Sequence, residues 1–256
     1  MHYKVPYHPS LLPIFKQVSV EILLGGIDDE LKSLNAMLKH TQEVEELSEY
    51  LYISHFLIQK SNCQNLGLHK LHCKICVSLL RYIKDIRPDK AFYEAGLSCK
   101  VEKQISMSFV FFNRFLDLAD AIDDPNAGMD ENNDFVYTDI PSVFDLSLPE
   151  KNYVDESKRS EIKDYILSIS VQKKTELTLP SRTCERCGTK LYEYALSCKK
   201  CQYKWEPCIV TGVPLFANVP SIKCKFCGRN AAKECWNEYV QKTQHCPWCD
   251  NVQTIY

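Results

Sequence analysis

Cysteine is the residue type that most clearly predicts chemistry in this sequence. The chain has 256 residues and 14 cysteines, and ten of these lie in the last 73 residues. Eight of the ten form four C-x2-C pairs, namely Cys184/Cys187, Cys198/Cys201, Cys224/Cys227 and Cys246/Cys249. In a reducing compartment, paired thiols at this spacing are typical metal ligands rather than disulfides.

The spacing of the four pairs predicts two zinc sites. Zn²⁺ prefers four soft ligands in a tetrahedron, and two C-x2-C turns supply them. The first four cysteines follow the spacing C-x2-C-x10-C-x2-C and the last four C-x2-C-x18-C-x2-C, with Gly188 and Gly228 after the first pair of each set. Glycine permits the tight backbone of such a turn. Because four cysteines leave no open coordination position, both zinc ions are expected to be structural.

Four pairs can be combined into two sites in three ways. Sequential pairing is favoured, because the ten residues between Cys187 and Cys198 suit a hairpin that returns to its own turn. A cross-brace, in which alternate pairs share an ion, is the main alternative. Redox-active or buried thiols are the alternative to metal binding altogether.

The other paired or isolated cysteines are predicted to be core residues. Cys208 and Cys235 stand alone in the cysteine-rich region, where a small apolar side chain suits the core. Cys73 and Cys76 could join a nearby histidine in a third metal site. They lie on an apolar helical stripe, however, which favours burial.

The remaining composition restricts the function classes. Residues 181–256 have 11 basic and 6 acidic residues, but eight thiolates and two zinc ions would leave this region at about +1. The positive surface that nucleic-acid binding needs is therefore not expected. The sequence has no Ser/His/Asp set, no phosphate-cradling glycine loop and no HExxH helix, so covalent catalysis is not expected either.

No membrane insertion is predicted, because no stretch approaches the ~18 uninterrupted apolar residues of a membrane span. Residues 11–24 are apolar but contain Pro13, Lys16 and Glu21, which a secretory signal would lack. An intracellular chain is therefore expected. Met1 is either a true start or the start of a fragment.

Charge and periodicity predict three regions: a helical-repeat region over 1–122, an acidic linker with a connecting helix over 123–180, and a two-zinc domain over 181–256. Apolar residues at helical spacing predict helices over residues 43–59, 66–86, 91–99 and 105–122. Successive helix pairs without strand signals predict a TPR-like α-solenoid fragment. The small residues Ala95 and Gly96 allow close helix packing.

The linker and the C-terminal region have their own predicted elements. Residues 123–135 are expected to form a solvated acidic loop and 136–149 an extended segment. A helix capped by Asp155 or Ser157 should then pack the cysteine-rich region against the helices. A hairpin over 205–216, turning at Thr211 and Gly212, precedes an amphipathic helix over 231–242. The predicted fold is mainly α, followed by a small zinc-stabilised α+β domain with the element order of RING, U-box or zinc-ribbon modules.

Several stretches resemble a known family. They are "NRFLDLADAI" at 113–122, "PCIVTGVPLF" at 207–216 and the terminal "CPWC". From about residue 91 to the end, the chain resembles the C-terminal region of the intraflagellar transport protein 172 family, subunits of the B complex of ciliary trains. The resemblance implies a non-enzymatic scaffold in cilium assembly, with other intraflagellar transport subunits as partners. It implies a location in the cilium or flagellum, at its base and in the cytoplasm.

A second function class follows from the likeness to U-box modules. Such modules bind ubiquitin or dock a ubiquitin-conjugating enzyme, and as E3 ligases they perform no covalent chemistry of their own. By this resemblance the partner-binding residues would be Ile209 or Val210 in one loop and Pro247 with Trp248 in the other. The alternative is that these side chains belong to the core of the hairpin and to the backbone of a zinc turn.

Overall fold

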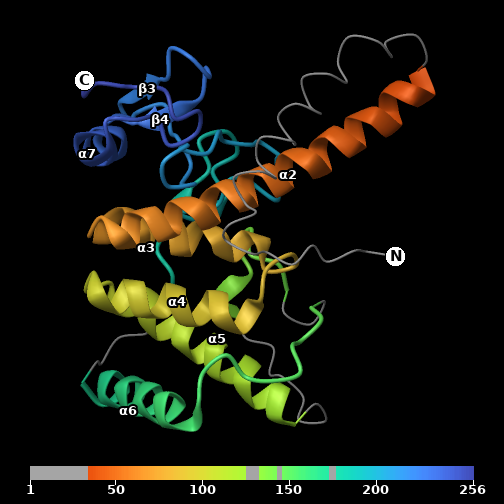
Figure 1. The fold of residues 1–256 in the computed structure, drawn as a ribbon. Coiled ribbons are helices and arrows are strands. Elements are labelled where there is room, and N and C mark those ends of the chain that lie inside the picture. Colours follow the sequence, from red (N-terminus) through yellow and green to blue (C-terminus); the bar gives the residue numbers. More distant parts are fainter. Residues whose placement is uncertain (1–33, 125–132, 143–145, 173–176) are drawn as a thin grey trace.

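A computed structural model describes residues 34–124, 133–142, 146–172 and 177–256 (Figure 1). Its first part is a stack of helices, and its C-terminal tail, residues 177–256, folds back onto one end of that stack. The helices of the stack are α2 (Leu34–Asn65), α3 (His69–Leu79), α4 (Pro88–Val101), α5 (Ile105–Asp123) and α6 (Glu156–Gln172). Short 3-10 helices follow α3 at Leu80–Tyr82 (η1) and lie within the linker at Asn133–Phe135 (η2).

Each helix of the stack packs on the next one along the chain, from α2 to α6. The turns after α2 and α4 share one geometry. Gly67 and Lys103 have positive φ values of 68° and 59°. The amide of the next residue hydrogen-bonds back to the helix, from Leu68 to the Cys63 carbonyl at 2.9 Å and from Gln104 to the Cys99 carbonyl at 2.8 Å. These turns end each helix and reverse the chain.

The α4–α5 contact depends on a small residue, as the sequence predicts. An ideal Cβ placed on Gly96 would lie 2.6 Å from the ring of Phe112, so a larger residue would push the two helices apart. Phe92, Phe111 and Phe115 are also buried at this contact. Close-packed aromatic side chains therefore form the centre of the helical stack.

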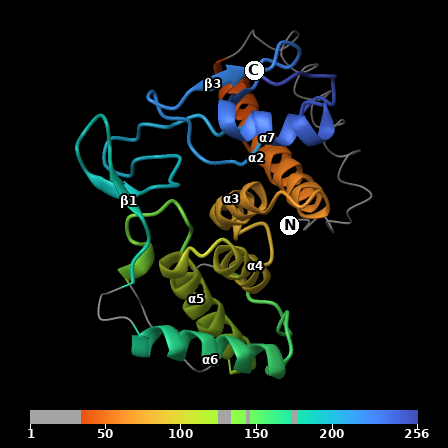
Figure 2. The same cartoon turned by 90° about the vertical axis from the view of Figure 1, so that its left-hand side faces the viewer.

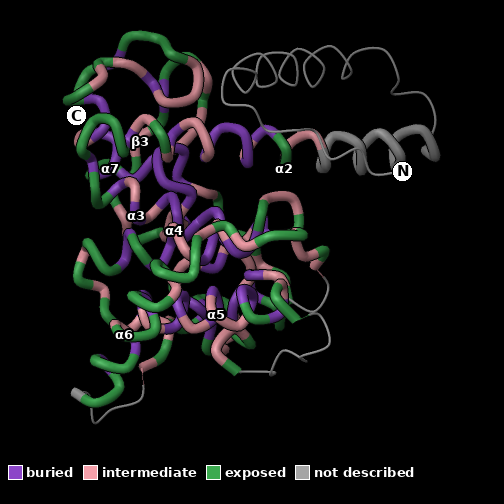
Figure 3. The backbone as a smooth tube through the Cα atoms, turned by 60° about the horizontal axis from the view of Figure 1, so that its bottom comes forward, coloured by how far each residue is buried: buried purple, intermediate pink, exposed green. Residues whose placement is uncertain are grey.

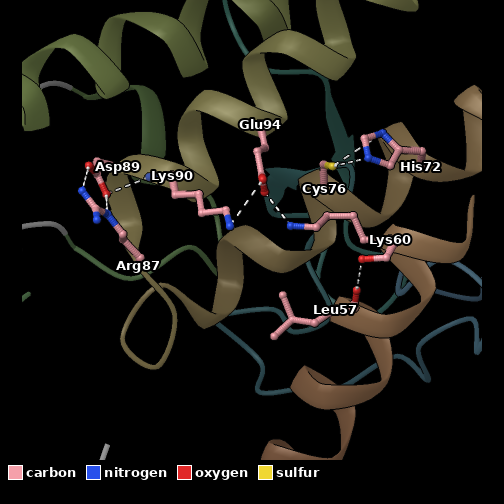
Figure 4. Close-up of polar contacts among 9 residues, drawn as sticks. Leu57, Lys60, His72, Cys76, Arg87, Asp89, Lys90 and Glu94 are labelled. Atoms are coloured by element: carbon pink, nitrogen blue, oxygen red, sulfur yellow. Dashed lines mark hydrogen bonds and ion pairs between the residues drawn. The ribbon is translucent and has the colours of Figure 1, made fainter. Parts of the chain in front are cut away.

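Two carboxylates of α4, Asp89 and Glu94, hold other segments of the chain in place through ion pairs and hydrogen bonds (Figure 4). Asp89 at the start of α4 has a fully buried side chain and accepts hydrogen bonds from Arg87 at 2.7 and 2.9 Å and from the Tyr153 amide at 2.9 Å. Lys60 of α2 reaches Glu94 of α4 at 2.5 Å. The carboxylate of Asp89 thereby fixes the segment that leads into α6.

Helix α6 begins where the sequence predicts but packs elsewhere. Asp155 is its N-cap, because its Oδ1 accepts a hydrogen bond from the Lys158 amide at 2.9 Å. The predicted apolar stripe faces α5, where the Tyr165 hydroxyl lies 2.9 Å from Ser108 Oγ. The expectation that this helix packs the tail against the stack is wrong, since Figure 1 shows α6 at the opposite end of the stack from α7.

Two other predicted segments fall partly or wholly outside the described residues. Residues 11–24 and most of the acidic loop, 125–132, are not described. Residues 136–140 form turns rather than extended chain, because the Thr138 hydroxyl donates to the Phe135 carbonyl at 2.8 Å. None of the described helices is long and apolar enough to cross a membrane.

The tail contains two small antiparallel hairpins with paired strands and one helix (Figure 2). Between these two hairpins, the predicted 205–216 hairpin is a loop closed by the isolated bridge of Pro207 with Pro214. Strand β1 (Ser181–Thr183) pairs with β2 (Lys190–Tyr192), and β3 (Ser221–Lys223) pairs with β4 (Asn230–Ala232). Helix α7 (Lys233–Thr243) starts two residues later than predicted, because residues 230–232 complete the second hairpin.

Two apolar clusters hold the tail to the stack, and Figure 3 shows the buried backbone that runs through this contact. In one cluster, Leu191 and Tyr192 of β2 join the core of α3 to α6. In the other, Trp236 of α7 and the hairpin residues Ile209 and Val210 pack on α2 and α3. The tail and the helices therefore share their cores.

Two glycines of the tail with the same backbone conformation make a matched test of this contact. Gly188 and Gly212 have φ values of 69° and 75°, but a Cβ at Gly212 would lie 2.8 Å from Ser78 Cβ of α3, whereas nothing lies within 4 Å at Gly188. Gly188→Ala should lower the free energy of unfolding by about 1 to 2 kcal/mol through the left-handed backbone alone. Gly212→Ala should lower it by about 2 to 5 kcal/mol, because overpacking against α3 adds to that cost.

Urea unfolding of the two variants measures the difference. Equal losses of stability in the two variants would show that the hairpin does not pack on α3 as described.

Candidate metal centres

Four tight turns carry the paired cysteines, and all four have the same backbone. In the first, the Cys184 amide donates to the Thr189 carbonyl at 2.9 Å and the Gly188 amide donates to the Cys184 carbonyl at 2.9 Å. The turns that begin at Cys198, Cys224 and Cys246 repeat both bonds at 2.8 to 3.0 Å. The fifth residue of each turn is left-handed, namely Gly188, Gln202, Gly228 and Asp250. This backbone directs both sulfurs of a turn toward one point.

The structure groups the eight cysteines into two tetrads in sequential order. The first tetrad is Cys184, Cys187, Cys198 and Cys201, and the second is Cys224, Cys227, Cys246 and Cys249. Within each tetrad all four Sγ atoms lie within 4.8 Å of one another. The alternative cross-brace grouping does not occur among the described residues.

The sulfur separations match a tetrahedral ion. The Sγ atoms of Cys184 and Cys201 are 3.6 Å apart, as are those of Cys187 and Cys198, and the corresponding pairs of the second tetrad are 3.9 Å apart. Four sulfurs at ~2.3 Å from a zinc ion lie ~3.8 Å from one another. Each tetrad could therefore hold a metal ion, and with four protein ligands it would leave no site for a substrate.

The surroundings favour the thiolate at some cysteines of the tetrads and the thiol at others. At Cys201 a hydrogen bond from the Tyr203 amide lowers the pKa, but burial and the neighbouring sulfurs raise it to about 11, and burial also raises the pKa of Cys224. Hydrogen bonds from the Thr189 side chain and amide lower the pKa of Cys187 to about 6. At Cys227, a hydrogen bond from Cys246, assisted by the Arg229 amide and opposed by burial, lowers the pKa to about 5. Since a metal binds the thiolate form, these donors ease the deprotonation of Cys187 and Cys227 in particular.

The two tetrads are built as a repeat. The hairpins β1–β2 and β3–β4 have the same three-residue register, pairing Ser181 with Tyr192 and Ser221 with Ala232. Each is followed by a second cysteine turn closed by an isolated bridge, Ser197 with Lys204 and His245 with Val252. Helix α7 lies between β4 and the last turn, which explains why the second spacing is eighteen residues and the first is ten.

The predicted partner-binding residues lie against this chain's own helices. Ile209 and Val210 are buried, and the Ile209 carbonyl accepts a hydrogen bond from His55 Nε2 of α2 at 2.6 Å. The Trp248 ring lies 4.7 Å from that of His55 and 5.4 Å from that of Tyr52. Trp248 also has the Arg229 guanidinium 4.3 Å from its ring centre. Pro247 belongs to the same turn.

Cys73, Cys76, Cys208 and Cys235 are buried, as predicted, and so are Cys63 and Cys99. The described part of the chain contains no third group of three or more metal-binding side chains. Cys73 lies in the α3–α4 core with its Sγ 3.7 Å from that of Cys99. Cys76 lies one helical turn from His72, at 3.7 Å from Nε2 (Figure 4).

Two polar residues that the sequence analysis does not identify fix the first tetrad to the stack. Arg81 of η1 donates to the Gly212 carbonyl at 2.7 Å, to the Tyr194 carbonyl at 2.8 Å and to Asp139 at 3.3 Å. Asp139 also accepts from the Leu196 amide at 2.8 Å. Both residues lie in segments without a motif, so no local signal indicates their role.

Comparison with known proteins gives one consistent family name. No family model matches the chain. It is 36% identical over 234 residues to Intraflagellar transport protein 172 of Chlamydomonas reinhardtii, an alignment that covers 87% of this chain and 13% of that protein. The Homo sapiens homolog is 36% identical over 91% of this chain and 13% of the homolog. Intraflagellar transport protein osm-1 of Caenorhabditis elegans is 31% identical over 196 residues, 73% of this chain and 11% of that protein.

The sequential grouping predicts how single ligand substitutions affect metal content. The protein purified with zinc under reducing conditions should carry two zinc ions per chain. Cys187→Ser and Cys201→Ser should each remove one ion, and the double variant should keep the other, because both residues belong to one tetrad.

Atomic absorption and a colorimetric zinc assay measure the stoichiometry, with Cys63→Ala as a control outside both tetrads. A double variant without any zinc would contradict the sequential grouping, and wild-type protein with less than one zinc per chain would contradict metal binding.

Proposed function

Because this chain is homologous over about nine-tenths of its length to the intraflagellar transport protein 172 family, we propose that it acts as part of a non-enzymatic intraflagellar transport subunit. Its role is to hold other train subunits together during cilium assembly. The homology is the observation that carries this proposal. The chain spans 13% of the length of the first relatives described above, so the partners and location of the whole protein are part of the proposal.

The helical stack supports a scaffold role. Each helix packs mainly on the next one along the chain, and such arrays form the extended surfaces that TPR-like solenoids use to bind proteins. Leu97 and Val101 lie one helical turn apart on α4 and are 43% and 58% exposed. Exposed apolar side chains on one face of a helix are typical of a protein contact. The partners on this surface would be other intraflagellar transport subunits, in the cilium or flagellum and at its base.

The tail would be a rigid end of the scaffold, with zinc as the ion in each tetrad. The donor set is four thiolates, which suits Zn²⁺, and the closed geometry suits a structural role. A region of about 80 residues with two short hairpins has little core of its own, so metal binding would supply much of its folding energy. The order of hairpin, turn, helix and cysteine turn is that of a RING or U-box-like module.

Ubiquitin or conjugating-enzyme binding is the less favoured function. By resemblance, the residues of this chain at the positions that U-box modules use for that contact are Ile209, Val210, Pro247 and Trp248. Ile209 and Val210 are buried, and Trp248 packs on His55 and Tyr52. A partner could reach Ile209 and Val210 only after the tail separates from α2, whereas Pro247 and Trp248 are half-buried.

The scaffold proposal predicts specific capture from cilia. The tagged 256-residue chain, added to extracts of isolated flagella, should recover intraflagellar transport subunits, identified by mass spectrometry. Leu97→Glu with Val101→Glu should reduce that recovery at least about tenfold, because charge on an apolar contact opposes its burial. Leu167→Glu on α6, another exposed position, is the control and should retain capture.

Two results would count against the proposal. One is a tagged chain that stays outside the cilium in ciliated cells and recovers no train subunit. The other is equal recovery by the α4 variant and the wild type, which would exclude that helix face as the contact.

Trp248 separates the scaffold from the ubiquitin-binding alternative. Trp248→Ala should lower the free energy of unfolding by about 2 to 3 kcal/mol, because the ring packs between α2 and Arg229. Phe226→Ala is a matched control in the facing turn of the same tetrad. Its side chain is 65% exposed, so it should change stability by less than about 0.5 kcal/mol.

Urea unfolding and a titration with ubiquitin measure the two effects. A Trp248→Ala variant of unchanged stability that binds ubiquitin about tenfold more weakly than the wild type would favour the alternative.

A further inference from the structure

The tail contains a fifth turn with the backbone of the four cysteine turns. It begins at Cys208, whose amide donates to the Val213 carbonyl at 2.7 Å, while the Gly212 amide donates to the Cys208 carbonyl at 2.7 Å. Gly212 has the left-handed φ of 75° that the fifth residue of each cysteine turn also has. Residues 208–212 therefore have the shape of a metal-binding turn.

The fifth turn lacks the ligands for a tetrahedral ion. Thr211 takes the position of the second cysteine, and the second sulfur comes from Cys235 of α7. Both sulfurs are buried, as is the Thr211 side chain. Two sulfurs and a hydroxyl are a poor donor set for zinc.

A lysine of the helical stack supplies positive charge at this place. Lys74 of α3 extends to the tail, and its Nζ lies 3.6 Å from Cys235 Sγ. Burial alone would lower the pKa of Lys74, but the neighbouring sulfur of Cys235 and the carboxylate of Glu234 raise it. The ammonium group of Lys74 therefore lies next to these thiols. In the four cysteine turns, the sulfurs face a candidate metal position instead.

The two thiols share one proton between them. Burial opposes ionisation of Cys208, but hydrogen bonds from Cys235 and Thr211 and from the Ala232 and Val210 amides outweigh it and lower its pKa to about 6. The hydrogen bond to Cys208, together with burial, raises the pKa of Cys235. At neutral pH the pair is thus one thiol and one thiolate, and Lys74 balances the negative charge.

A cavity gives access to this pair. Its volume is about 550 Å³, and it lies between α3, the first tetrad's hairpin and the start of α7. Lys74 and Cys235 line it, together with the apolar side chains of Val213, Phe216 and Val219. A small neutral molecule that enters the cavity meets Cys235 first, with Cys208 behind it.

We propose that Cys208 and Cys235 are a redox modification site, at which a hydroperoxide of the hydrogen peroxide class converts the two thiols into a disulfide. The site is separate from the two tetrads, and it lies where the tail meets the helical stack. A thiolate, a second thiol beside it and an entry path are the requirements for this reaction, and the structure has all three.

The reaction balances without any further reagent. Cys235 first transfers its proton to Cys208 and becomes the thiolate. The Cys235 thiolate then attacks a peroxide oxygen, which forms a sulfenic acid on Cys235 and releases hydroxide. Cys208 then attacks Cys235 Sγ, the S–S bond forms, and the sulfenic hydroxide leaves. The proton of Cys208 and one from solvent convert the two hydroxides into water. The two cysteines lose two electrons and the peroxide gains them.

Oxidation also changes the contact between the tail and the stack. A disulfide carries no charge, so Lys74 loses the thiolate that balances its ammonium group in a half-buried position. The carboxylate of Glu234 still faces Lys74, but a half-buried charge that has lost one of its partners weakens the contact that contains it. The modified chain should therefore hold its tail less tightly on α3.

The chain contains a matched control pair. Cys73 and Cys99 are also buried, with their Sγ atoms 3.7 Å apart, but neither lines the 550 Å³ cavity and Lys74 does not hydrogen-bond to either. A preference for Cys208 and Cys235 therefore tests the cavity and the direct contact with Lys74, rather than proximity of thiols alone.

The experiment titrates the full, reduced, zinc-loaded chain with hydrogen peroxide. Free thiols are then alkylated in acid, and disulfide-linked peptides are measured after digestion without reductant. The Cys208–Cys235 link should appear at a peroxide dose at least about tenfold lower than the Cys73–Cys99 link, with zinc content unchanged at that dose. Equal doses for the two links, or zinc release before the Cys208–Cys235 link forms, would overturn the proposal.

Lysine variants test the role of the charge. Lys74→Met removes the ammonium group at nearly constant length and should slow formation of the link at least about fivefold. Lys70→Met, at an exposed position of the same helix, should leave the rate unchanged. A Lys74→Met chain that oxidises at the wild-type rate would show that Lys74 does not activate the pair.

Discussion

The contact of residues 208–212 with α2 and α3 is the interaction on which the arrangement of the molecule depends. Gly212 approaches Ser78 so closely that no larger residue fits without displacement, and His55 and Arg81 donate hydrogen bonds to the carbonyls of Ile209 and Gly212. These bonds satisfy backbone groups that burial would otherwise leave unpaired. The same hairpin connects the two tetrads along the chain, so its position on the helices fixes where both lie.

Local sequence determines the cysteine turns, and for that reason they could be predicted. A C-x2-C turn is complete within six residues, and a glycine or a tolerant polar residue at its fifth position is visible in the sequence. The helices could be predicted on the same ground, because their apolar periodicity is local, and so could the Asp155 cap. Gly96 at the α4–α5 contact follows from size alone.

Contacts between distant residues could not be predicted in this way. Asp139 and Arg81 lie 58 residues apart, and neither belongs to a motif. Lys74 meets Cys235 across 161 residues, which no periodicity reveals. The position of α6 was predicted wrongly for a related reason: an apolar stripe indicates that a helix is buried but not which neighbour covers it. His55, whose ring packs on that of Trp248, likewise lies far from it in the sequence.

The long separation between α2–α3 and the hairpin that covers them also affects how the chain folds. His55 precedes its partner Ile209 by 154 residues, and Arg81 precedes Gly212 by 131. At a synthesis rate of ~5 to 20 residues per second, the apolar face of these two helices waits roughly 7 to 30 s on the ribosome before its cover emerges. Contacts between residues so far apart in sequence also form slowly in the released chain, because a long loop must close first. During that interval the nascent helices present an uncovered apolar face, which is the kind of surface that chaperones protect from aggregation.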